Sequence, residues 1–302
     1  MNKHVFLDNL TAAIGALLAG KKKFFAKSII SPSFEEHLKS IEIKMPEINK
    51  EGTYDINAKT LVGMTNPAFK VAKWIGHDYP TIIYHHGNNE RPFDFNRSAK
   101  NTFANIFIKT KEDIRTNLIV VRAPFHNNSL KVYQEKMTEL KNFTAMIAVS
   151  VKLNEEIISV LRKKNNTSII TSGISLGGWV TNLHRSFYNT STAYVPLLAG
   201  TFLGELFLKS KYKKLTSKLA LQQPKKIREL LNFNNFYKKI KDQNVFPLLA
   251  RYDQFIEYDV EKVSYEGYIL KTIEGGHVTG SLETKEELRY HILEVLNNIL
   301  EI

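Results

Sequence analysis

The chain has 302 residues, 43% of them hydrophobic and 24% charged, which suits a globular protein with one large core or two modest ones. It contains no cysteine, and this excludes a disulfide framework, a thiolate zinc site and a cysteine nucleophile. The formal charge of +12 comes mostly from lysines dispersed among asparagines, without the arginine and aromatic interleaving of a nucleic-acid platform, so we expect a solvated lysine-rich surface and no nucleic-acid partner.

The N-terminal segment carries an apolar stretch at residues 10–19 that is too short to span a bilayer. The lysines at residues 21–23 follow this stretch, which is the wrong side for a secretory signal, so we expect a cytoplasmic protein. An amphipathic helix is predicted because apolar residues recur at helical spacing. These residues are Phe6, Leu10, Ile14 and Leu17. We expect this apolar face to dock on the body of the protein, and peripheral contact with a membrane surface is the alternative.

The next part of the chain predicts a sheet. Residues 41–64 alternate apolar and polar positions, as expected of antiparallel strands that open a sheet. Short, continuous apolar runs follow at residues 81–85, 117–122 and 168–171, separated by long helical stretches, and this alternation predicts βαβ units and a parallel sheet. The longest of these helices is predicted at residues 134–164. Its apolar face comprises Leu140, Ile147, Val151, Ile158 and Leu161.

The C-terminal part continues this pattern. Strands are predicted at residues 193–198, 244–252 and 268–273, although the first two contain a proline, which is tolerated at a strand entrance or edge. A last helix is predicted at residues 284–300. The segment at residues 200–243 is helical in pattern and too long for a plain crossover, so we expect it to add a small helical cap. The fold class is therefore α/β, with a mostly parallel, doubly wound sheet.

Residues 168–180 have the layout of a strand, a tight turn and a helix. Gly173 and Gly177 stand two positions on either side of Ser175, where small residues let the backbones pass closely. The turn points the backbone N–H of Leu176 toward the site, and the helix N-terminus adds positive potential there. Ser175 is therefore a candidate nucleophile, and a glycine-rich turn that recurs by chance is the alternative.

A serine nucleophile needs a base, and the base needs an orienting carboxylate. Asp253 follows a predicted strand at the edge where open parallel sheets bind ligands. His277 follows the next predicted strand and a pair of glycines, in the loop before the last helix. Glu257 and Asp259 lie close enough to compete with Asp253 for the acid role.

These motifs and their chain order resemble those of serine hydrolases with the α/β-hydrolase fold, a superfamily of esterases, lipases and acyl peptidases. The resemblance rests on GISLGG around Ser175, on His86 and Gly87 after an earlier strand, on Asp253, and on GGH ending at His277. It implies Ser175 as the nucleophile, His277 as general base and then acid, and Asp253 as the orienting carboxylate.

The resemblance also implies an oxyanion hole formed by the backbone N–H groups of Leu176 and Asn88. The loop HHGNNE lacks the longer HGGG motif of some lipases and esterases. It resembles the oxyanion loop of those members of the superfamily that have a single glycine at this place. The resemblance covers residues 41–302, which we interpret as one hydrolase domain with residues 200–243 as its helical cap. Residues 1–40 then form an N-terminal helical extension.

The expected activity is hydrolysis of a carboxylic ester with a small or medium acyl group through an acyl-enzyme, without a cofactor. Phe202 and Phe207 of the cap are expected to contact this small-molecule substrate. The same triad also serves thioesterases, peptidases and acyltransferases, and these stay open as alternatives. A non-catalytic binding protein on a hydrolase scaffold is a further alternative, against which the complete Ser, Asp and His set argues.

Two further groups of residues lie at predicted strand ends. His85 and His86 suggest a metal pair, but adjacent strand residues point to opposite faces, so we expect no metal and assign them to positioning the oxyanion loop. Arg122 and His126 follow another strand. For these two residues, contact with an acidic group of the substrate and simple solvent exposure are equal alternatives.

Overall fold

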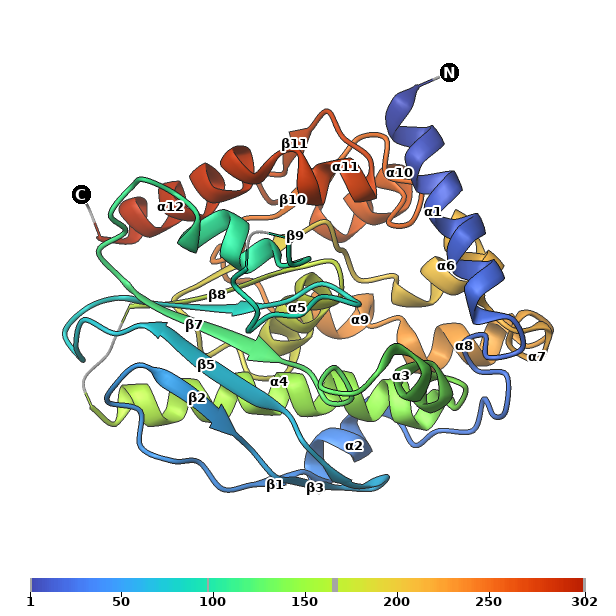
Figure 1. The fold of residues 1–302 in the computed structure, drawn as a ribbon, viewed down its shortest axis with the longest axis horizontal. Coiled ribbons are helices and arrows are strands. Elements are labelled where there is room, and N and C mark those ends of the chain that lie inside the picture. Colours follow the sequence, from blue (N-terminus) through green and yellow to red (C-terminus); the bar gives the residue numbers. More distant parts are fainter. Residues whose placement is uncertain (1, 97, 165–167, 301–302) are drawn as a thin grey trace.

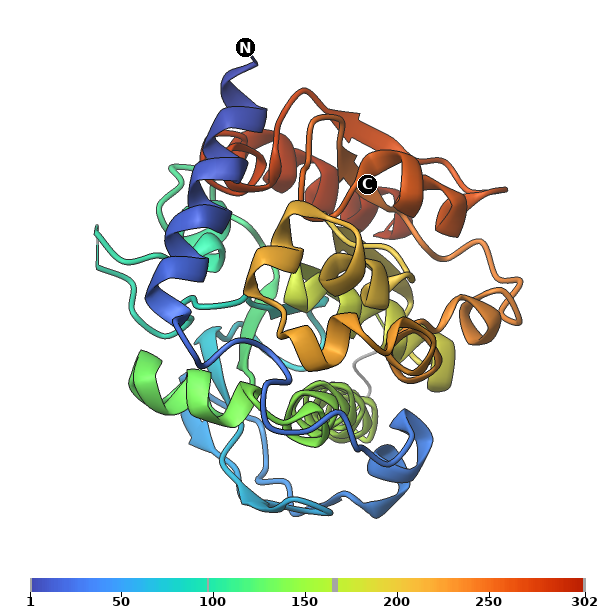
Figure 2. The same ribbon diagram turned by 90° about the vertical axis from the view of Figure 1, so that its right-hand side faces the viewer.

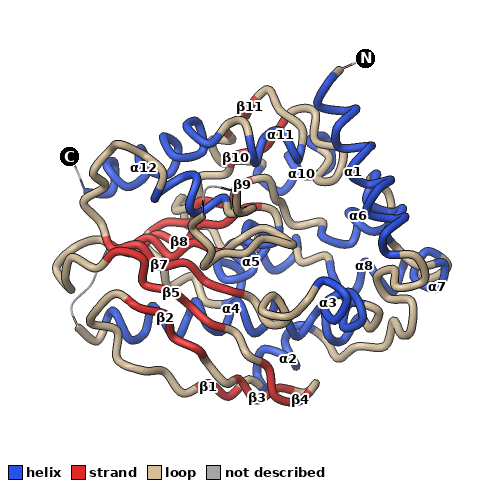
Figure 3. The backbone as a smooth tube through the Cα atoms, viewed as in Figure 1, coloured by secondary structure: helices blue, strands red, loops and turns tan. Residues whose placement is uncertain are grey.

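The structure is a computed structural model and describes residues 2–96, 98–164 and 168–300. A twisted eight-stranded sheet lies at its centre (Figures 1 and 3). The strands, in spatial order, are β11 (Lys271–Ile273), β10 (Leu248–Ala250), β9 (Ala193–Leu197), β8 (Ile169–Ile174), β6 (Thr81–His85), β7 (Asn117–Arg122), β5 (Ala68–Lys73) and β2 (Gly52–Asp55). Neighbouring strands from β11 to β7 are parallel, whereas β5 and β2 are antiparallel additions at one edge.

Helices cover both faces of this sheet (Figure 1). On one face lie α4 (Leu140–Arg162) and α5 (Leu176–Phe187), and on the other lie α12 (Lys285–Leu300) and a short π-helix, η1 (Ala104–Ile108). The alternation of side chains along β6 explains why both faces are apolar. Ile82 and Tyr84 pack in the core cluster that contains η1 and α12, and Ile83 packs in the cluster that contains α4.

The remaining helices surround the carboxyl ends of the parallel strands or flank the sheet. They are α1 (Lys3–Ala19), α2 (Phe34–Ser40), α3 (Leu130–Met137), α6 (Leu203–Leu208), the 3-10 helix η2 (Lys211–Leu215), α7 (Lys218–Leu221), α8 (Pro224–Leu231), α9 (Asn234–Tyr237), α10 (Tyr258–Glu261), the 3-10 helix η3 (Lys262–Tyr265) and α11 (His277–Leu282). The segment at residues 200–243 is helical, as its sequence pattern predicts.

The predicted parallel sheet is confirmed, and β6 and β7 have the predicted bounds. The antiparallel strands predicted at residues 41–64 exist, but only β2 joins the main sheet. The others, β1 (Glu42–Ile43), β3 (Ala58–Thr60) and β4 (Gly63–Thr65), form a separate three-stranded sheet. The sequence pattern did not predict β5, which lies between β2 and β7 and connects the edge strand β2 to the rest of the sheet.

The helix predicted at residues 134–164 is interrupted and forms two helices, α3 and α4. The break is stabilised by backbone bonds to a distant segment. The N–H groups of Lys27 and Ser28 donate to the carbonyl of Thr138, and the N–H of Leu140 donates to the carbonyl of Ser28. The apolar face predicted for this helix is nevertheless buried throughout, which confirms its helical period.

The amphipathic helix predicted near the N-terminus is α1, but its orientation differs from our expectation. The helix lies along the outside of the molecule beside η2 and α11 (Figure 2). Its inward face carries Asp8, Ala12 and Ala19, all buried. The Asp8 carboxylate fixes this orientation because it accepts hydrogen bonds from the loop after β10 and from the first turn of α11. The expected docking face of Phe6, Leu10, Ile14 and Leu17 is exposed instead. In the described part of the chain, no helix combines the length and apolar character needed to cross a bilayer.

Candidate active site

Ser175 occupies a tight turn between β8 and α5, as the sequence predicts. Its backbone has φ 55° and ψ −110°, a conformation that a residue with a side chain rarely adopts. The flanking glycines are required by close backbone contacts. A Cβ added at Gly173 would lie 2.8 Å from the carbonyl oxygen of His85, and one added at Gly177 would lie 2.0 Å from the same oxygen. The turn therefore holds the Ser175 side chain clear of the sheet edge.

Asp253 and His277 come together from two successive strand ends. The Nδ1 atom of His277 lies 2.8 Å from Oδ2 of Asp253. The other carboxylate oxygen, Oδ1, accepts the backbone N–H groups of Phe255 and Ile256, each at 2.8 Å. Asp253 is buried, so its carboxylate has a single fixed orientation toward the imidazole.

The two other acids that compete in the sequence lie elsewhere. Glu257 precedes α10, and Asp259 is exposed and pairs with Lys262 at 2.6 Å. Among the carboxylates after β10, Asp253 is therefore the one that the fold places on His277.

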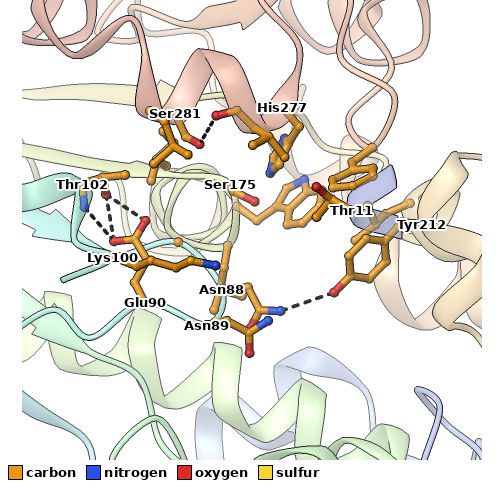
Figure 4. A pocket seen from close by; sticks show the side chains of 18 of the residues that line it. Thr11, Asn88, Asn89, Glu90, Lys100, Thr102, Ser175, Tyr212, His277 and Ser281 are labelled. Atoms are coloured by element: carbon orange, nitrogen blue, oxygen red, sulfur yellow. Dashed lines mark hydrogen bonds between the residues drawn. The ribbon is translucent and has the colours of Figure 1, made fainter. Parts of the chain in front are cut away.

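Ser175 and His277 line the same cavity (Figure 4). No hydrogen bond joins their side chains in the described chain. Such bonds are often long in ligand-free enzymes and tighten when substrate binds. Their shared cavity has a volume of about 280 Å³, which is room for a small or medium ligand.

The cavity wall is mainly apolar and comes from widely separated segments. Its apolar members are Phe24, Phe143, Ile174, Leu176, Trp179, Leu206, Phe207, Tyr212, Phe255, Val278 and Leu282. Residues 200–243 contribute part of this wall, including Phe207, for which substrate contact is predicted. Phe202 does not line the cavity, because it lies one residue before α6, where its backbone pairs with Asn232 and its N–H donates to Glu261.

The loop that follows β6 lies opposite the turn and is held by side chains. His86 accepts the N–H of Ala123 at Nε2, 3.1 Å away, and its Nδ1 lies 2.6 Å from the carbonyl of Gly87, so the ring is neutral with its proton on Nδ1. Asn88 accepts a hydrogen bond of 2.6 Å from the Tyr133 hydroxyl and donates one of 3.3 Å to Tyr212. Gly87, Asn88 and Leu176 all line the cavity.

Glu90 is a half-buried acid in the same loop that the sequence pattern did not single out. It accepts hydrogen bonds from the backbone N–H and the hydroxyl of Thr102, at 3.0 and 2.9 Å. Burial raises the pKa of Glu90 to about 7 despite these donors. The side chain lines the cavity and ties the segment after Gly87 to the start of η1.

The described residues contain no group of histidines and acids that could hold a metal ion. His85 and His86 do not point to opposite faces, contrary to our prediction, because β6 ends at His85 and the two rings stack with centroids 4.8 Å apart. Arg122 pairs with the exposed Asp55, and His126 is half-buried, with Nε2 3.3 Å from the Asn88 side chain.

The N-terminal helix supplies one cavity residue and one supporting residue that the sequence pattern did not indicate. Thr11 of α1 lines the cavity. Asp8, one turn before it, accepts the N–H groups of Gln254 at 3.0 Å, His277 at 2.8 Å and Val278 at 2.9 Å. The only sequence signal for Asp8 was a single acid within an apolar helix, which by itself is typical of a solvated face.

The electrostatics around His277 favour its charged form. Burial disfavours the imidazolium ion, but the charge and hydrogen bond of Asp253 and the nearby charge of Asp8 outweigh it, so the pKa of His277 is raised above its ordinary value. A histidine that is stabilised when protonated is suited to receive a proton from a hydroxyl group.

The strand order, the helices on both faces and the turn at Ser175 define the α/β-hydrolase fold, as predicted. Three solved structures that match this chain over 84% of its length have the same fold. They are an esterase from Pyrococcus furiosus (16% identity, TM-score 0.55, 95% of that chain), acetyl xylan esterase 1 from Thermoanaerobacterium (15%, 0.52, 90%) and an acylaminoacyl peptidase from Pyrococcus horikoshii (12%, 0.52), of which only 42% is covered. No protein-family model and no curated protein matches the chain.

Proposed function

We propose that the protein is a serine hydrolase that cleaves a carboxylic ester of a small or medium acyl group through an acyl-enzyme. The observation that carries the proposal is that Ser175 and His277 line one cavity, with His277 bonded to the buried Asp253. Two of the similar solved structures are esterases and one is an acylaminoacyl peptidase, which supports acyl transfer as the reaction class.

In the proposed mechanism, the Oγ atom of Ser175 attacks the acyl carbonyl carbon while His277 accepts the hydroxyl proton at Nε2. Asp253 holds the proton of His277 on Nδ1, which leaves Nε2 free to accept, and stabilises the imidazolium ion that forms. The charged oxygen of the tetrahedral intermediate is bound by the N–H groups of Leu176 and Asn88. The Leu176 N–H is available because the leading N–H groups of a helix have no partner within it.

Collapse of this intermediate breaks the bond to the leaving group, which takes the proton from His277. Water then attacks the acyl-enzyme and gives its proton to the same nitrogen, and a second collapse returns the proton to Ser175 and releases the acid. The apolar wall of the cavity suits the acyl chain, because it removes that chain from water without requiring hydrogen bonds.

The proposal is tested by assaying the purified protein on a panel of esters, thioesters and aminoacyl amides with matched acyl groups. We expect the highest kcat/KM on esters. Preference for the thioesters or amides would assign the same residues to thioesterase or peptidase activity, and acceptor competition with alcohols would identify an acyltransferase. Absence of turnover on every member of the panel would favour a binding protein.

Phe207 should help to set the acyl-chain preference. Replacing it with serine removes apolar surface from the cavity wall, so we expect kcat/KM to fall more for long acyl chains than for short ones. One buried methylene contributes about 0.8 kcal/mol, so the preference should change by several-fold per carbon. Phe202→Ser is the matched control, because Phe202 lies in the same segment but outside the cavity lining, and it should leave the ratio between chains unchanged. Equal losses for all chain lengths in Phe207→Ser would contradict this role.

A further inference from the structure

The outward face of α1 is an exposed apolar surface. Its four residues recur at positions i, i+4, i+8 and i+11, so they share one side of the helix. We call Phe6, Leu10, Ile14 and Leu17 the α1 outer face. Leu17 is 81% exposed, and Leu18 beside it is 66% exposed. Because the opposite side holds the buried Asp8 and Ala12, this surface points away from the body of the protein.

The charges around the α1 outer face indicate what it can bind. Asp8 is the only acidic residue of α1, and it is buried. Exposed lysines stand at the C-terminal end of the helix, at Lys21, and on the adjoining η2, at Lys213 and Lys214. A second copy of the chain would bring like charges together at the same face, in a protein whose formal charge is +12. An anionic phospholipid surface offers negative charge to the lysines and an apolar interior to the exposed apolar side chains.

The position of α1 relative to the cavity is consistent with such a surface. Thr11 of α1 and Leu282 of α11 both line the cavity, and both are exposed, so the cavity opens beside the helix. α1 and α11 also pack against each other. A lipid layer in contact with α1 would therefore lie next to the opening.

We propose that the α1 outer face docks the protein on an anionic phospholipid surface, with its apolar side chains at the acyl boundary and the nearby lysines at the headgroups. This geometry is that of an interfacial amphipathic helix, which lies in the plane of the membrane and does not span it. The docking goes beyond the proposed hydrolase activity and does not depend on it.

Sedimentation with vesicles tests the docking directly. We expect the full-length protein to bind vesicles that contain phosphatidylglycerol at least tenfold more tightly than vesicles of phosphatidylcholine alone, and to bind more weakly in high salt. Replacing Leu10 and Leu17 together with serine should lower the affinity at least tenfold, because two apolar side chains no longer enter the bilayer. In the matched control, Leu61 and Ile269 are both replaced with serine, because these two residues are similarly exposed on other parts of the surface. Its affinity should equal that of the unaltered protein.

Several results would overturn the docking proposal. One is the absence of binding to phosphatidylglycerol vesicles, and another is an equal loss of affinity in the two double variants. Light scattering provides the third: if the unaltered protein is a dimer and the Leu10, Leu17 double variant is a monomer, a second copy of the chain covers this face. Both double variants change only exposed side chains, so their melting temperatures should match that of the unaltered protein.

The inward face of α1 carries an independent inference. One carboxylate, that of Asp8, accepts three backbone N–H groups, one from the loop after β10 and two from the first turn of α11. Gln254 directly follows Asp253, and the other two donors are His277 itself and its neighbour Val278. The carboxylate is fully buried, so water does not replace these bonds if they are lost.

We infer that Asp8 is a positioning residue that fixes Asp253 and His277 relative to each other. This inference rests on the proposed function, because its consequence is catalytic. An asparagine at position 8 has the same size but only one acceptor oxygen, so it cannot satisfy both sets of donors. Asp8→Asn should therefore lower kcat by roughly tenfold to a hundredfold with a smaller change in KM, as expected of displaced catalytic groups.

The pH profile separates positioning from general destabilisation. The charged groups near His277 are Asp253 after β10 and Asp8 on α1, and Glu90 and Lys100 line the same cavity. The charge of Asp8 raises the pKa of His277, so its removal should move the acid limb of kcat/KM to lower pH. A loss of folded protein that is the same at every pH lowers kcat/KM throughout and does not move this limb.

The control for Asp8→Asn is Lys3→Ala, which breaks the exposed ion pair between α1 and Glu283 and should leave both kcat and the limb unchanged. If Asp8→Asn behaves like this control, the positioning role is wrong. If the unaltered protein turns over no ester, thioester or amide, the proposed function itself has failed.

Discussion

Replacing Ser175 with alanine is expected to abolish turnover, lowering kcat by about four to six orders of magnitude. The loss follows from the proposed mechanism, in which Ser175 forms the acyl-enzyme, while the rest of the cavity stays in place. A fluorophosphonate probe should label the unaltered protein at Ser175 with one equivalent, and the alanine variant should not be labelled. Mass spectrometry of the labelled peptide provides the measurement.

The cavity offers a matched control for this experiment. Ser281 also lines the cavity, but its hydroxyl donates to the carbonyl of Val278 at 2.9 Å, and it lies on α11, away from the strained turn (Figure 4). Ser281→Ala should retain both labelling and turnover. Stoichiometric labelling of the Ser175→Ala variant with activity intact would remove Ser175 from the mechanism.

The sequence predicted the central strands because their residues are buried on both faces. β6 and β7 are continuous β-branched and aromatic runs, and this pattern requires no knowledge of distant neighbours. β5 was missed because its AFKVAK sequence mixes lysine and alanine with larger apolar residues, and its identity as a strand depends on pairing with β2 and β7. β10 is shorter than predicted because Pro247 has no N–H for the ladder, which separates an isolated bridge between Val245 and Tyr194 from the strand that begins at Leu248.

The contributions of the N-terminal segment could not be predicted from local pattern. The periodicity of α1 shows which residues share a face, but the buried side is fixed by three hydrogen bonds to Asp8 from the loop after β10 and the first turn of α11, which are distant in the chain. Phe24 reaches the cavity wall for a similar reason, because its backbone pairs with the carbonyl of Leu215 in η2. Chain order predicted Asp253 and His277 more readily, since parallel strands end at one edge of a sheet.

Among the acids after β10, Asp253 should be the one whose neutral isostere removes activity. Its Oδ1 atom is held by two backbone N–H groups, so in Asp253→Asn the amide oxygen takes that place and the Nδ2 group faces His277. The imidazole must then accept at Nδ1 and carry its proton on Nε2, the atom that receives the proton of Ser175 in the proposed mechanism. We expect kcat to fall by about a thousandfold or more with the fold intact.

The same assay on Glu257→Gln and Asp259→Asn completes this comparison, because neither carboxylate bonds to His277 in the described structure. Both variants should retain near-normal kcat, and their melting temperatures should stay close to that of the unaltered protein because both side chains are at least partly exposed.

In Asp253→Asn the acid limb of kcat/KM should also move to lower pH, since burial then lowers the pKa of His277 without the charge that opposes it. If Asp253→Asn were silent while Glu257→Gln or Asp259→Asn lost activity, the acid would have to reach His277 from the α10 segment, and the loop between β10 and α10 would have to rearrange when substrate binds.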